Sequence, residues 1–266
     1  MVTTVSGKRW LIDCGRQAPD QLESAGLSWH ELDGQIVTHV HGDHVYGMED
    51  FAFRRYFEAQ RGVESVMRGG PRPALIAHSA VLEEVWESLA PSLRYLKNDE
   101  GDPRSGSLAS YFDVAGAVTS EAPRSNPWAH AERFLVGDMG LTARECQHVP
   151  GKPSCSLELE LDAGNPDGAL AWWSGDSTVD TDLLVALEPR TSIFFHDCTF
   201  IDYPGQVHGA YELLARLPEV VRRKVVVMHH DDDLEDHVAR VRSDGFRVAL
   251  PGQTWDLVSG ELIGEA

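Results

Sequence analysis

The chain of 266 residues is poor in basic side chains, in cysteine and in long apolar stretches. It holds 23 lysines and arginines against 42 aspartates and glutamates, so the formal net charge is −19. Proteins that bind long nucleic acids neutralise phosphates with clustered Lys and Arg, and this balance argues against such a partner. It leaves room for chemistry on a small phosphorylated ligand, because a bound metal can supply positive charge locally.

The few cysteines exclude two further classes of protein. None forms a C-x-x-C pair, and they are too scattered for a disulfide framework or a structural zinc knuckle. They are Cys14, Cys146, Cys155 and Cys198. We interpret them as reduced thiols in a cytoplasmic protein. No stretch approaches about 18 consecutive apolar residues, and the first residues lack the shape of a signal peptide, so no membrane association is expected.

Short apolar runs alternate with amphipathic helical patterns along the chain. The predicted strands are residues 8–14, 35–38, 74–77, 133–136, 156–161, 169–173, 192–195, 225–228 and 246–249. The predicted helices are residues 49–61, 80–96, 181–187, 210–217 and 234–242. This alternation predicts an α/β layered fold. No composition typical of a linker and no repeat interrupts it, so we predict a single domain over residues 1–266.

Two segments rich in Gly, Pro and Ser are predicted as loops, residues 61–73 and 97–128. The second is long for a compact domain, and such loops are often functional lids. Its aromatic residues Tyr111, Phe112 and Trp128 could stack on a nucleobase. Trp173 is a further candidate, and a place in the core is the alternative for all four.

The most informative residues form the pattern His39-x-His41-x-Asp43-His44, directly after an apolar strand. Histidines two positions apart point the same way in an extended segment. A tight turn at Gly42 would then aim the Asp-His pair at a second point nearby. Imidazoles with a carboxylate suit zinc, with iron or manganese as other possibilities. The alternative is a polar loop that is histidine-rich without a metal.

This pattern resembles the signature of the metallo-β-lactamase superfamily, which implies an αββα sandwich with a dinuclear metal site at one edge. The resemblance implies three further ligands, each near a strand end: His148, Asp176 and His229. It assigns His39, His41 and His148 to one metal, Asp43, His44 and His229 to the other, and Asp176 to both. The metals would be two divalent ions, with zinc expected and manganese as the alternative. His230 is the rival of His229, because alternation along a strand lets only one of two neighbours face inward.

Three passages resemble the phosphodiesterase branch of the superfamily, which contains ribonuclease Z. They are WSGDS at 173–177 with FFHDCTF at 194–200, VHGAY at 207–211, and the strand that leads to His229. The resemblance implies that His208 acts as general acid or phosphate stabiliser and that Asp43 acts as ligand and base. For His196, direct catalysis and a role in orienting a ligand both stay open. A helix-start histidine bonded to the backbone is the alternative for His208.

One departure from ribonuclease Z points to small substrates. Those enzymes carry a long arm between the third histidine ligand and the bridging aspartate, whereas His148 and Asp176 are only 28 positions apart. The remaining similarity is to the compact anti-Pycsar family, which destroys cyclic nucleotide signals of bacterial immunity. It is carried by LIDCG at 11–15, LSW at 27–29 and EDFAFRRYF at 49–57. That family opens with a strand that this chain is expected to lack.

We therefore predict a dinuclear metal phosphodiesterase that hydrolyses a small phosphodiester, foremost a 3′,5′-cyclic mononucleotide. The predicted partner is a nucleotide substrate, without a long nucleic acid, and the resemblance implies a homodimer. The predicted location is the cytoplasm of a bacterium, or the cytoplasm of the host if a phage encodes the protein. The alternatives are a nuclease acting on RNA or single-stranded DNA, a lactone or thiolester hydrolase, and a metal-stabilised protein that only binds nucleotides.

Overall fold

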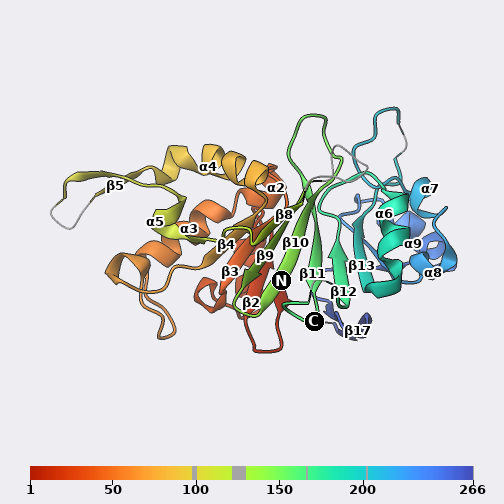
Figure 1. The fold of residues 1–266 in the computed structure, drawn as a ribbon, viewed down its shortest axis with the longest axis horizontal. Helices are drawn as coiled ribbons and strands as arrows, with labels where there is room; N and C mark the ends of the chain where they lie inside the picture. The colour runs from red at the N-terminus through yellow and green to blue at the C-terminus, as the bar shows by residue number, and fades with distance from the viewer. Residues whose placement is uncertain (98–100, 122–129, 166, 202, 266) are drawn as a thin grey trace. The chain divides into compact units, whose positions relative to one another are not determined.

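The computed structural model describes residues 1–97, 101–121, 130–165, 167–201 and 203–265 (Figure 1). The chain forms two compact units, each described here by itself. Unit 1 comprises Met1–Val118 and Val136–Asp138, and unit 2 comprises Thr119–Leu135 and Met139–Ala266. Within the described residues, no helix is both long enough and apolar enough to cross a membrane. The prediction of a single domain stays a prediction.

Unit 1 is built on a five-stranded sheet in which four neighbouring strands run parallel. In order across the sheet these are β1 (Val2–Thr3), β2 (Arg9–Ile12), β3 (Gly34–Val37), β4 (Ala74–Ala77) and β7 (Asp113–Val114), with β1 antiparallel to β2. Every residue of β3 is buried, as expected for a central parallel strand covered on both faces. Because β2, β3 and β4 run parallel, the residues that follow them emerge at one edge of the sheet.

The helices of unit 1 carry clear sequence signals. They are α1 (Ala18–Ser24), α2 (Gly42–Val45), α3 (Met48–Phe57), α4 (Ser79–Leu93) and α5 (Leu108–Tyr111). The long helix α4 buries Val81, Val85, Leu89 and Leu93, one residue per turn on one face. Helix α3 has acidic residues in its first turn and arginines in its last, which complements the helix dipole. Figure 1 shows α3 beside α4. A small hairpin, β5 (Tyr95–Lys97) with β6 (Pro103–Ser105), follows α4.

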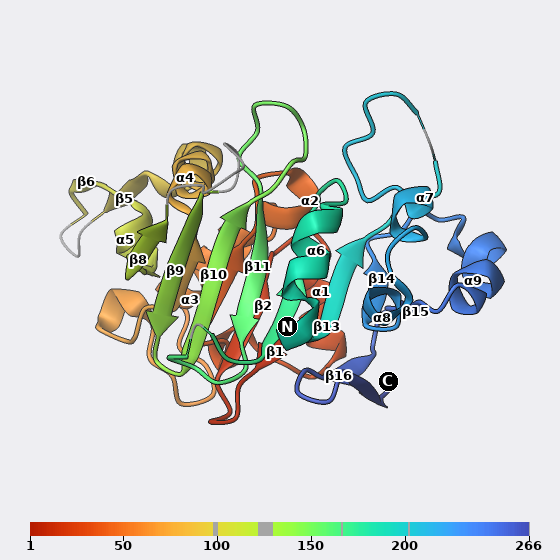
Figure 2. The ribbon, with the colours of Figure 1, turned by 45° about the vertical axis from the view of Figure 1, so that its right-hand side comes forward.

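Unit 2 contains an eight-stranded mixed sheet. In order across it lie β15 (Arg247–Val248), β14 (Val225–Met228), β13 (Thr191–Asp197), β12 (Leu170–Trp173), β11 (Cys155–Glu160), β10 (Met139–Glu145), β9 (Ala131–Val136) and β8 (Thr119–Glu121). The strands from β12 to β15 are parallel, and the β8–β9, β10–β11 and β11–β12 pairs are antiparallel. Figure 2 shows β9, β10 and β11 side by side. A hairpin of β16 (Thr254–Asp256) and β17 (Glu261–Gly264) completes the unit.

Helices cover the parallel half of this sheet. They are α6 (Thr181–Leu187), α7 (Tyr211–Leu214), α8 (Glu219–Arg222) and α9 (Leu234–Ser243). Their apolar residues, such as Leu184 and Val241, join Phe194 and Val227 of the strands in one buried cluster. Helix α6, in front of the sheet in Figure 2, begins where the Asp180 carboxylate accepts a hydrogen bond from the Leu183 N–H at 3.0 Å.

Most of the predicted elements are confirmed. The strands at 74–77 and 225–228 and the helix at 181–187 have the predicted bounds, and the other elements differ by at most four residues at either end. The predicted loop at 97–128 is wrong in part, because it contains β6, α5, β7 and β8. These short elements form through tertiary contacts, which a composition rich in Gly, Pro and Ser does not reveal.

Two of the proposed base-stacking aromatics belong to the core instead. Tyr111 and Phe112 are each 1% exposed, and the Tyr111 hydroxyl donates to the Leu93 carbonyl oxygen at 2.9 Å. The Phe112 ring stacks on that of Phe51 in α3. A role for Tyr111 and Phe112 in covering a ligand is therefore excluded. Trp128 lies outside the described residues.

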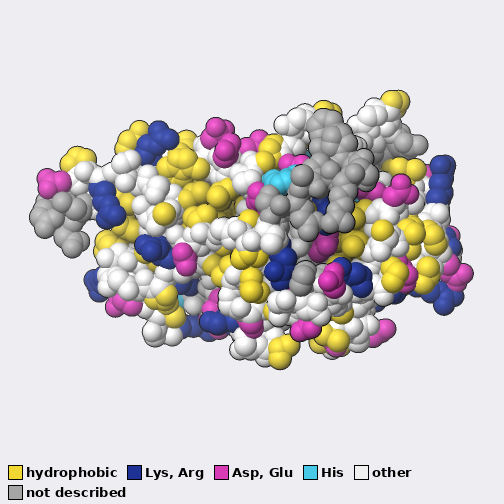
Figure 3. All heavy atoms as spheres, viewed as in Figure 1, with side chains coloured by type: hydrophobic (Ala, Val, Ile, Leu, Met, Phe, Trp, Pro, Cys, Tyr) yellow, Lys and Arg dark blue, Asp and Glu magenta, His cyan; other side chains and the backbone are white. Residues whose placement is uncertain are grey.

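Charged side chains are dispersed on the surface drawn in Figure 3. In the described part of that face, Lys and Arg lie singly or in small groups among acidic and apolar side chains, without a continuous basic stripe. A duplex or a long single strand needs such a stripe to neutralise consecutive phosphates. Within each unit, the described part of this face offers no surface of that kind.

Strand β11 is buried along its whole length although two of its residues are glutamates. Arg133 Nε donates to Glu160 Oε1 at 2.6 Å and Arg133 Nη2 donates to Glu160 Oε2 at 2.9 Å. Glu158, the other glutamate of β11, accepts a hydrogen bond at Oε1 from Arg144 Nε of β10 at 2.7 Å. The bidentate pair is the more buried of the two, because the Glu160 side chain is only 2% exposed.

We predict that Arg133→Met destabilises the protein by about 3 kcal/mol, because it leaves the Glu160 carboxylate buried without its charged partner. Urea unfolding followed by circular dichroism would measure the change. The control is Arg223→Met, which removes an exposed pair with Glu219 and should cost less than about 1 kcal/mol. Equal effects of the two substitutions would contradict the assigned importance of the buried pair.

Candidate metal and catalytic site

The histidine pattern of unit 1 starts where β3 ends. His39 is fully buried, and its Nε2 lies 3.0 Å from Nδ1 of His41, whose backbone is still extended. The His39 ring is also 4.1 Å from the His44 ring, between centroids. The extended segment thus brings His39 and His41 together, and the start of α2 brings the His44 ring against His39, where the spacing predicted that His44 would face a second point nearby.

Gly42 has a different role from the one expected. It does not form a turn with positive φ but opens the short helix α2, which carries Asp43 and His44. A Cβ at position 42 would collide with the ring of Tyr46. The glycine therefore provides space for this ring next to the histidines.

Asp13, which the sequence did not single out as a site residue, holds this cluster in place. It follows β2 with φ of +55°, a conformation that is uncommon for a residue other than glycine. Its carboxylate accepts hydrogen bonds from the Thr38 N–H at 2.8 Å, the Thr38 hydroxyl at 2.7 Å and His44 Nδ1 at 2.8 Å. A position directly after an apolar strand, like that of the predicted ligands, was the signal that could have found it.

The contact with Asp13 decides which nitrogen His44 presents. Because Nδ1 donates to a carboxylate, a neutral His44 ring carries its lone pair on Nε2. This Nε2 lies 3.5 Å from Oδ2 of Asp43, whose side chain is 61% exposed. A carboxylate behind a histidine ligand is the usual support of metal-binding imidazoles.

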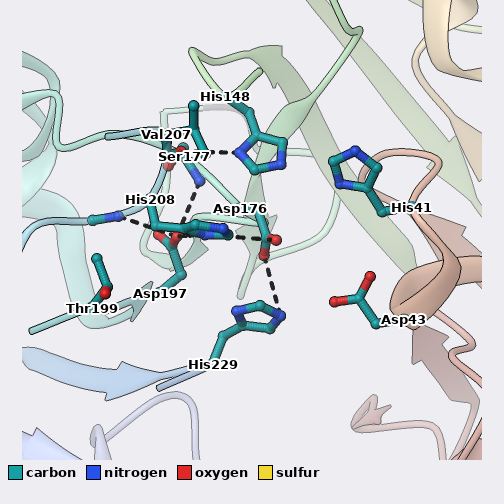
Figure 4. A network of polar contacts seen from close by, with 12 residues as sticks. His41, Asp43, His148, Asp176, Ser177, Asp197, Thr199, Val207, His208 and His229 are labelled. Carbon is teal, nitrogen blue, oxygen red and sulfur yellow. Dashed lines mark hydrogen bonds and ion pairs between the residues drawn. The ribbon is translucent and has the colours of Figure 1, made fainter. Parts of the chain in front are cut away.

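In unit 2, three polar residues of the candidate site lie at or just beyond the ends of three parallel strands (Figure 4). Asp176 follows β12, Asp197 is the last residue of β13, and His229 follows β14. Asp176 and Asp197 are 2% and 0% exposed. Their carboxylates and the His208 ring each offer one donor atom, and these atoms lie within 4.8 Å of one another.

His229, rather than His230, faces this group. Its Nε2 is 3.8 Å from Oδ1 of Asp176, the contact dashed in Figure 4. The Nε2 of His230 instead lies 3.3 Å from the carbonyl oxygen of Ala249. Strand alternation is not the cause, because His229 lies beyond β14 with φ of +48°. This left-handed turn of the backbone aims its side chain.

His148 is held by a backbone contact. Its Nδ1 donates to the Val207 carbonyl oxygen at 2.9 Å, so a neutral ring has its lone pair on Nε2. Burial lowers the pKa of His148, which keeps the imidazole neutral at physiological pH. A neutral, oriented imidazole is the form that binds a metal ion.

His208 is paired with a buried carboxylate. Its Nδ1 donates to Oδ2 of Asp197 at 3.0 Å and lies 3.8 Å from Oδ2 of Asp176. The hydrogen bond to Asp197 raises the pKa of His208. Burial opposes ionisation of Asp197, but hydrogen bonds from His196 and His208 outweigh it and lower the pKa of Asp197 to about 2. The ionised Asp197 carboxylate therefore favours the protonated form of His208 more than water does.

His196 contacts Asp197 and is not exposed at all. Its Nδ1 lies 2.8 Å from the backbone carbonyl oxygen of Asp197 and 3.0 Å from Oδ1 of its carboxylate. Its ring packs against that of Trp172. The sequence left open direct catalysis and the orientation of a ligand; these contacts instead indicate that His196 positions Asp197, which was not among the predicted ligands.

Comparison with known proteins shows to which family this chain belongs. The family model described as "Anti-Pycsar protein Apyc1" matches residues 1–253. The chain belongs to the anti-Pycsar Apyc1 family. A relative with that name from Bacillus phage 010DV004 is 32% identical over 259 residues, which is 97% of this chain and 90% of the relative. Another from Paenibacillus harenae is 29% identical over 93% of this chain and 88% of its own length.

Solved structures confirm the predicted metallo-β-lactamase fold of this family member. A diphosphatase of the PhnP family has a TM-score of 0.61 at 17% identity, covering 96% of this chain and 83% of its own. The metallo-β-lactamase fold protein YhfI from Bacillus subtilis has a TM-score of 0.56 at 14% identity, covering 91% and 85%. Human tRNase Z, short form, also reaches 0.56, at 16% identity, covering 90% and 85%.

The donor chemistry fits a divalent metal. Imidazole nitrogens and carboxylate oxygens are the ligands that zinc and manganese take in proteins. In each unit, contacts to the protein orient donors of this kind, as for His44 and His148. Together with the fold, these clusters indicate divalent metal binding and support a metal-dependent hydrolase.

We predict that Asp13→Ala weakens metal binding about 10- to 100-fold, because His44 loses the acceptor that orients it. Competition with a chromophoric chelator would measure the affinity. Asp20→Ala removes an exposed carboxylate in the first turn of α1 and should leave the affinity as it is. Metal affinity in Asp13→Ala equal to that of the Asp20 variant would show that Asp13 does not support a ligand.

Proposed function

We propose that the protein hydrolyses a small phosphodiester, foremost a 3′,5′-cyclic mononucleotide, with two divalent metal ions. The observation that carries this proposal is the Asp197–His208 pair beside the Asp176 carboxylate. This pair supports the proposal that His208 donates a proton to the leaving oxygen of a phosphodiester. Membership of the anti-Pycsar family supports a cyclic nucleotide signal as the substrate.

Seven residues are proposed to hold the metals, with zinc the foremost candidate and manganese the second. His39, His41 and His148 would bind one ion, Asp43, His44 and His229 the other, and Asp176 both. When bound, the ions would neutralise charge on the phosphate and activate water for attack. Support comes from the orientation of these side chains within each unit, where His39, His41 and His44 gather and His229 faces Asp176.

The proposed proton transfer follows from the hydrogen bonds of His208. Its Nδ1–H is held by the Asp197 carboxylate, which leaves Nε2–H on the opposite side of the ring as the proton donor. Donation to the leaving oxygen turns His208 into a neutral imidazole, and Asp197 keeps the ring in position throughout. Asp43 is proposed as a ligand that also acts as a base, for which its exposed carboxylate is suited.

Charge favours a small substrate over a polymer. The net charge of −19 repels a long polyanion, and the described face in Figure 3 has no continuous basic stripe. A single phosphodiester needs positive charge at one point only, which bound metal ions provide. The interval between His148 and Asp176 adds to this argument, because it consists of β11, β12 and short connections without an inserted arm.

A homodimer and a cytoplasmic location, in a bacterium or in a phage-infected host, remain part of this proposal. Both rest on the family resemblance. Light scattering coupled to gel filtration would test the dimer.

A substrate panel tests the proposed function. With zinc or manganese, the protein is expected to open 3′,5′-cyclic mononucleotides to monophosphates and to leave a precursor transfer RNA intact. The panel holds four cyclic mononucleotides, cyclic dinucleotides, the RNA and bis(p-nitrophenyl) phosphate, with products separated by chromatography. Cleavage of the RNA without any turnover of cyclic nucleotides would establish a nuclease instead.

Two ligand variants show whether turnover on this panel belongs to the proposed centre. His41→Ala and Asp43→Ala should abolish it, and elemental analysis should find two metal equivalents in the unaltered chain. Full activity in either variant would refute the ligand assignment. His237→Ala is the matched control, because this histidine lies on α9 and pairs with Asp233.

We predict that His208→Ala lowers kcat on cyclic mononucleotides about 10²- to 10⁴-fold, as expected for loss of a general acid. A better leaving group needs less protonation, so the loss of kcat in this variant should be smaller on bis(p-nitrophenyl) phosphate. Steady-state kinetics on both substrates would give the two ratios. An equal loss on both would indicate that His208 stabilises charge on the phosphate rather than protonating the leaving oxygen.

A further inference from the structure

A pocket of about 300 Å³ opens in unit 2 beside His208 and His229. Its volume is at the lower end of the range found for small-molecule sites. The lining residues are Thr199, Ile201, Tyr203, Gln206, His208, His229, His230 and Asp231. Three of them, Thr199, His208 and His229, are drawn in Figure 4. The pocket is therefore lined in part by His208 and His229 of the proposed site, whereas Asp176 and Asp197 do not line it.

The chemistry of the lining suits a neutral, flat group rather than a phosphate. Among the described residues that line the pocket there is no lysine or arginine, whereas Asp231 brings a negative charge. Two large apolar side chains point into solvent-accessible space there, with Ile201 55% and Tyr203 46% exposed. An exposed aromatic ring next to an aliphatic side chain offers a surface on which a planar ring can stack.

A tight turn fixes the wall that carries Tyr203. The Gln206 N–H donates to the Tyr203 carbonyl oxygen at 3.1 Å, and Gly205 between them has φ of +86°. With Pro204 before the glycine, this is a type II turn. The Gln206 side chain braces the turn, because its Nε2 donates to the Ile201 carbonyl oxygen at 2.8 Å and its Oε1 accepts from the His208 N–H at 3.0 Å.

A second set of hydrogen bonds joins this wall, through Ile201 and Thr199, to Asp231 of the lining. The Thr199 hydroxyl donates to Oδ2 of Asp231 at 2.9 Å and accepts from the Ile201 N–H at 3.2 Å. Thr199 also forms a parallel bridge with Ala210. The pocket is thus formed by hydrogen bonds within the protein before any ligand enters, which lowers the entropic cost of binding.

We propose that this pocket binds the nucleobase of the substrate and that Tyr203 stacks on it, with Ile201 packing alongside. This inference rests on the proposed function, since the phosphate would lie next to His208 and His229 while the base enters the pocket. Tyr203 then sets the preference for nucleotides over phosphodiesters that lack a base.

The test compares kcat/KM for the 3′,5′-cyclic mononucleotides with that for 1-O-methylribose 3,5-cyclic phosphate, which has no base. Tyr203→Ala should lower this ratio about tenfold, the usual effect of losing one stacked base. Tyr203→Phe should keep the ratio within about twofold of the unaltered enzyme, because stacking needs the ring and not the hydroxyl. Tyr95→Ala, in the hairpin of unit 1 and 77% exposed, is the matched control.

Failure of the pocket and failure of the proposed function give different results. If cyclic nucleotides are hydrolysed and Tyr203→Ala keeps the ratio of the unaltered enzyme, the pocket does not bind the base. If no phosphodiester is hydrolysed at all, the proposed function fails, and calorimetry with nucleoside 5′-monophosphates tests the pocket by itself. Binding that weakens about tenfold in Tyr203→Ala supports it, and the absence of binding overturns it.

Discussion

The parallel register of a few short strands is the constraint on which the site depends. In unit 2, β12, β13 and β14 pair in parallel, so their carboxyl ends lie along one edge of the sheet. Asp176, Asp197 and His229 are found there because each follows or ends one of these strands. Unit 1 uses the same device, since Asp13 directly follows β2 and His39 is the second residue after β3. An antiparallel arrangement would send neighbouring strand ends to opposite edges.

At each of these sheet edges, one carboxylate contacts histidine side chains and holds their rings in position. Asp13 accepts hydrogen bonds from Thr38 and His44 in unit 1. In unit 2, the Asp197 carboxylate accepts them from His208 and the Gly209 N–H, and it lies 3.0 Å from Nδ1 of His196. A buried carboxylate is costly unless donors surround it, and these donors satisfy that need while they fix the imidazole rings. The same hydrogen bonds therefore stabilise the fold and hold the imidazole rings of the proposed site, and a substitution at either aspartate is expected to affect both.

The sequence reveals residues whose role depends on local spacing and misses those whose role depends on distant segments. The cluster from His39 to His44 lies within six positions, so its pattern alone predicts that these side chains gather. The part played by Asp197 depends on the loop that returns His208 to it, and no spacing encodes that contact. For the same reason the predicted loop at 97–128 hid α5 and the buried ring of Tyr111. Strands and helices with long apolar patterns, by contrast, were found within a few residues.

The left-handed backbone at His229 sets a local cost in stability against the position of a proposed metal ligand. Only three non-glycine residues in the described part of the chain have positive φ, and two of them, Asp13 and His229, belong to the candidate site. A glycine at position 229 would relieve about 1 kcal/mol of backbone strain and would at the same time remove an imidazole. If His229 holds a metal as proposed, selection for heat resistance alone would favour a glycine that removes this ligand. A screen for robust variants must therefore select for turnover as well.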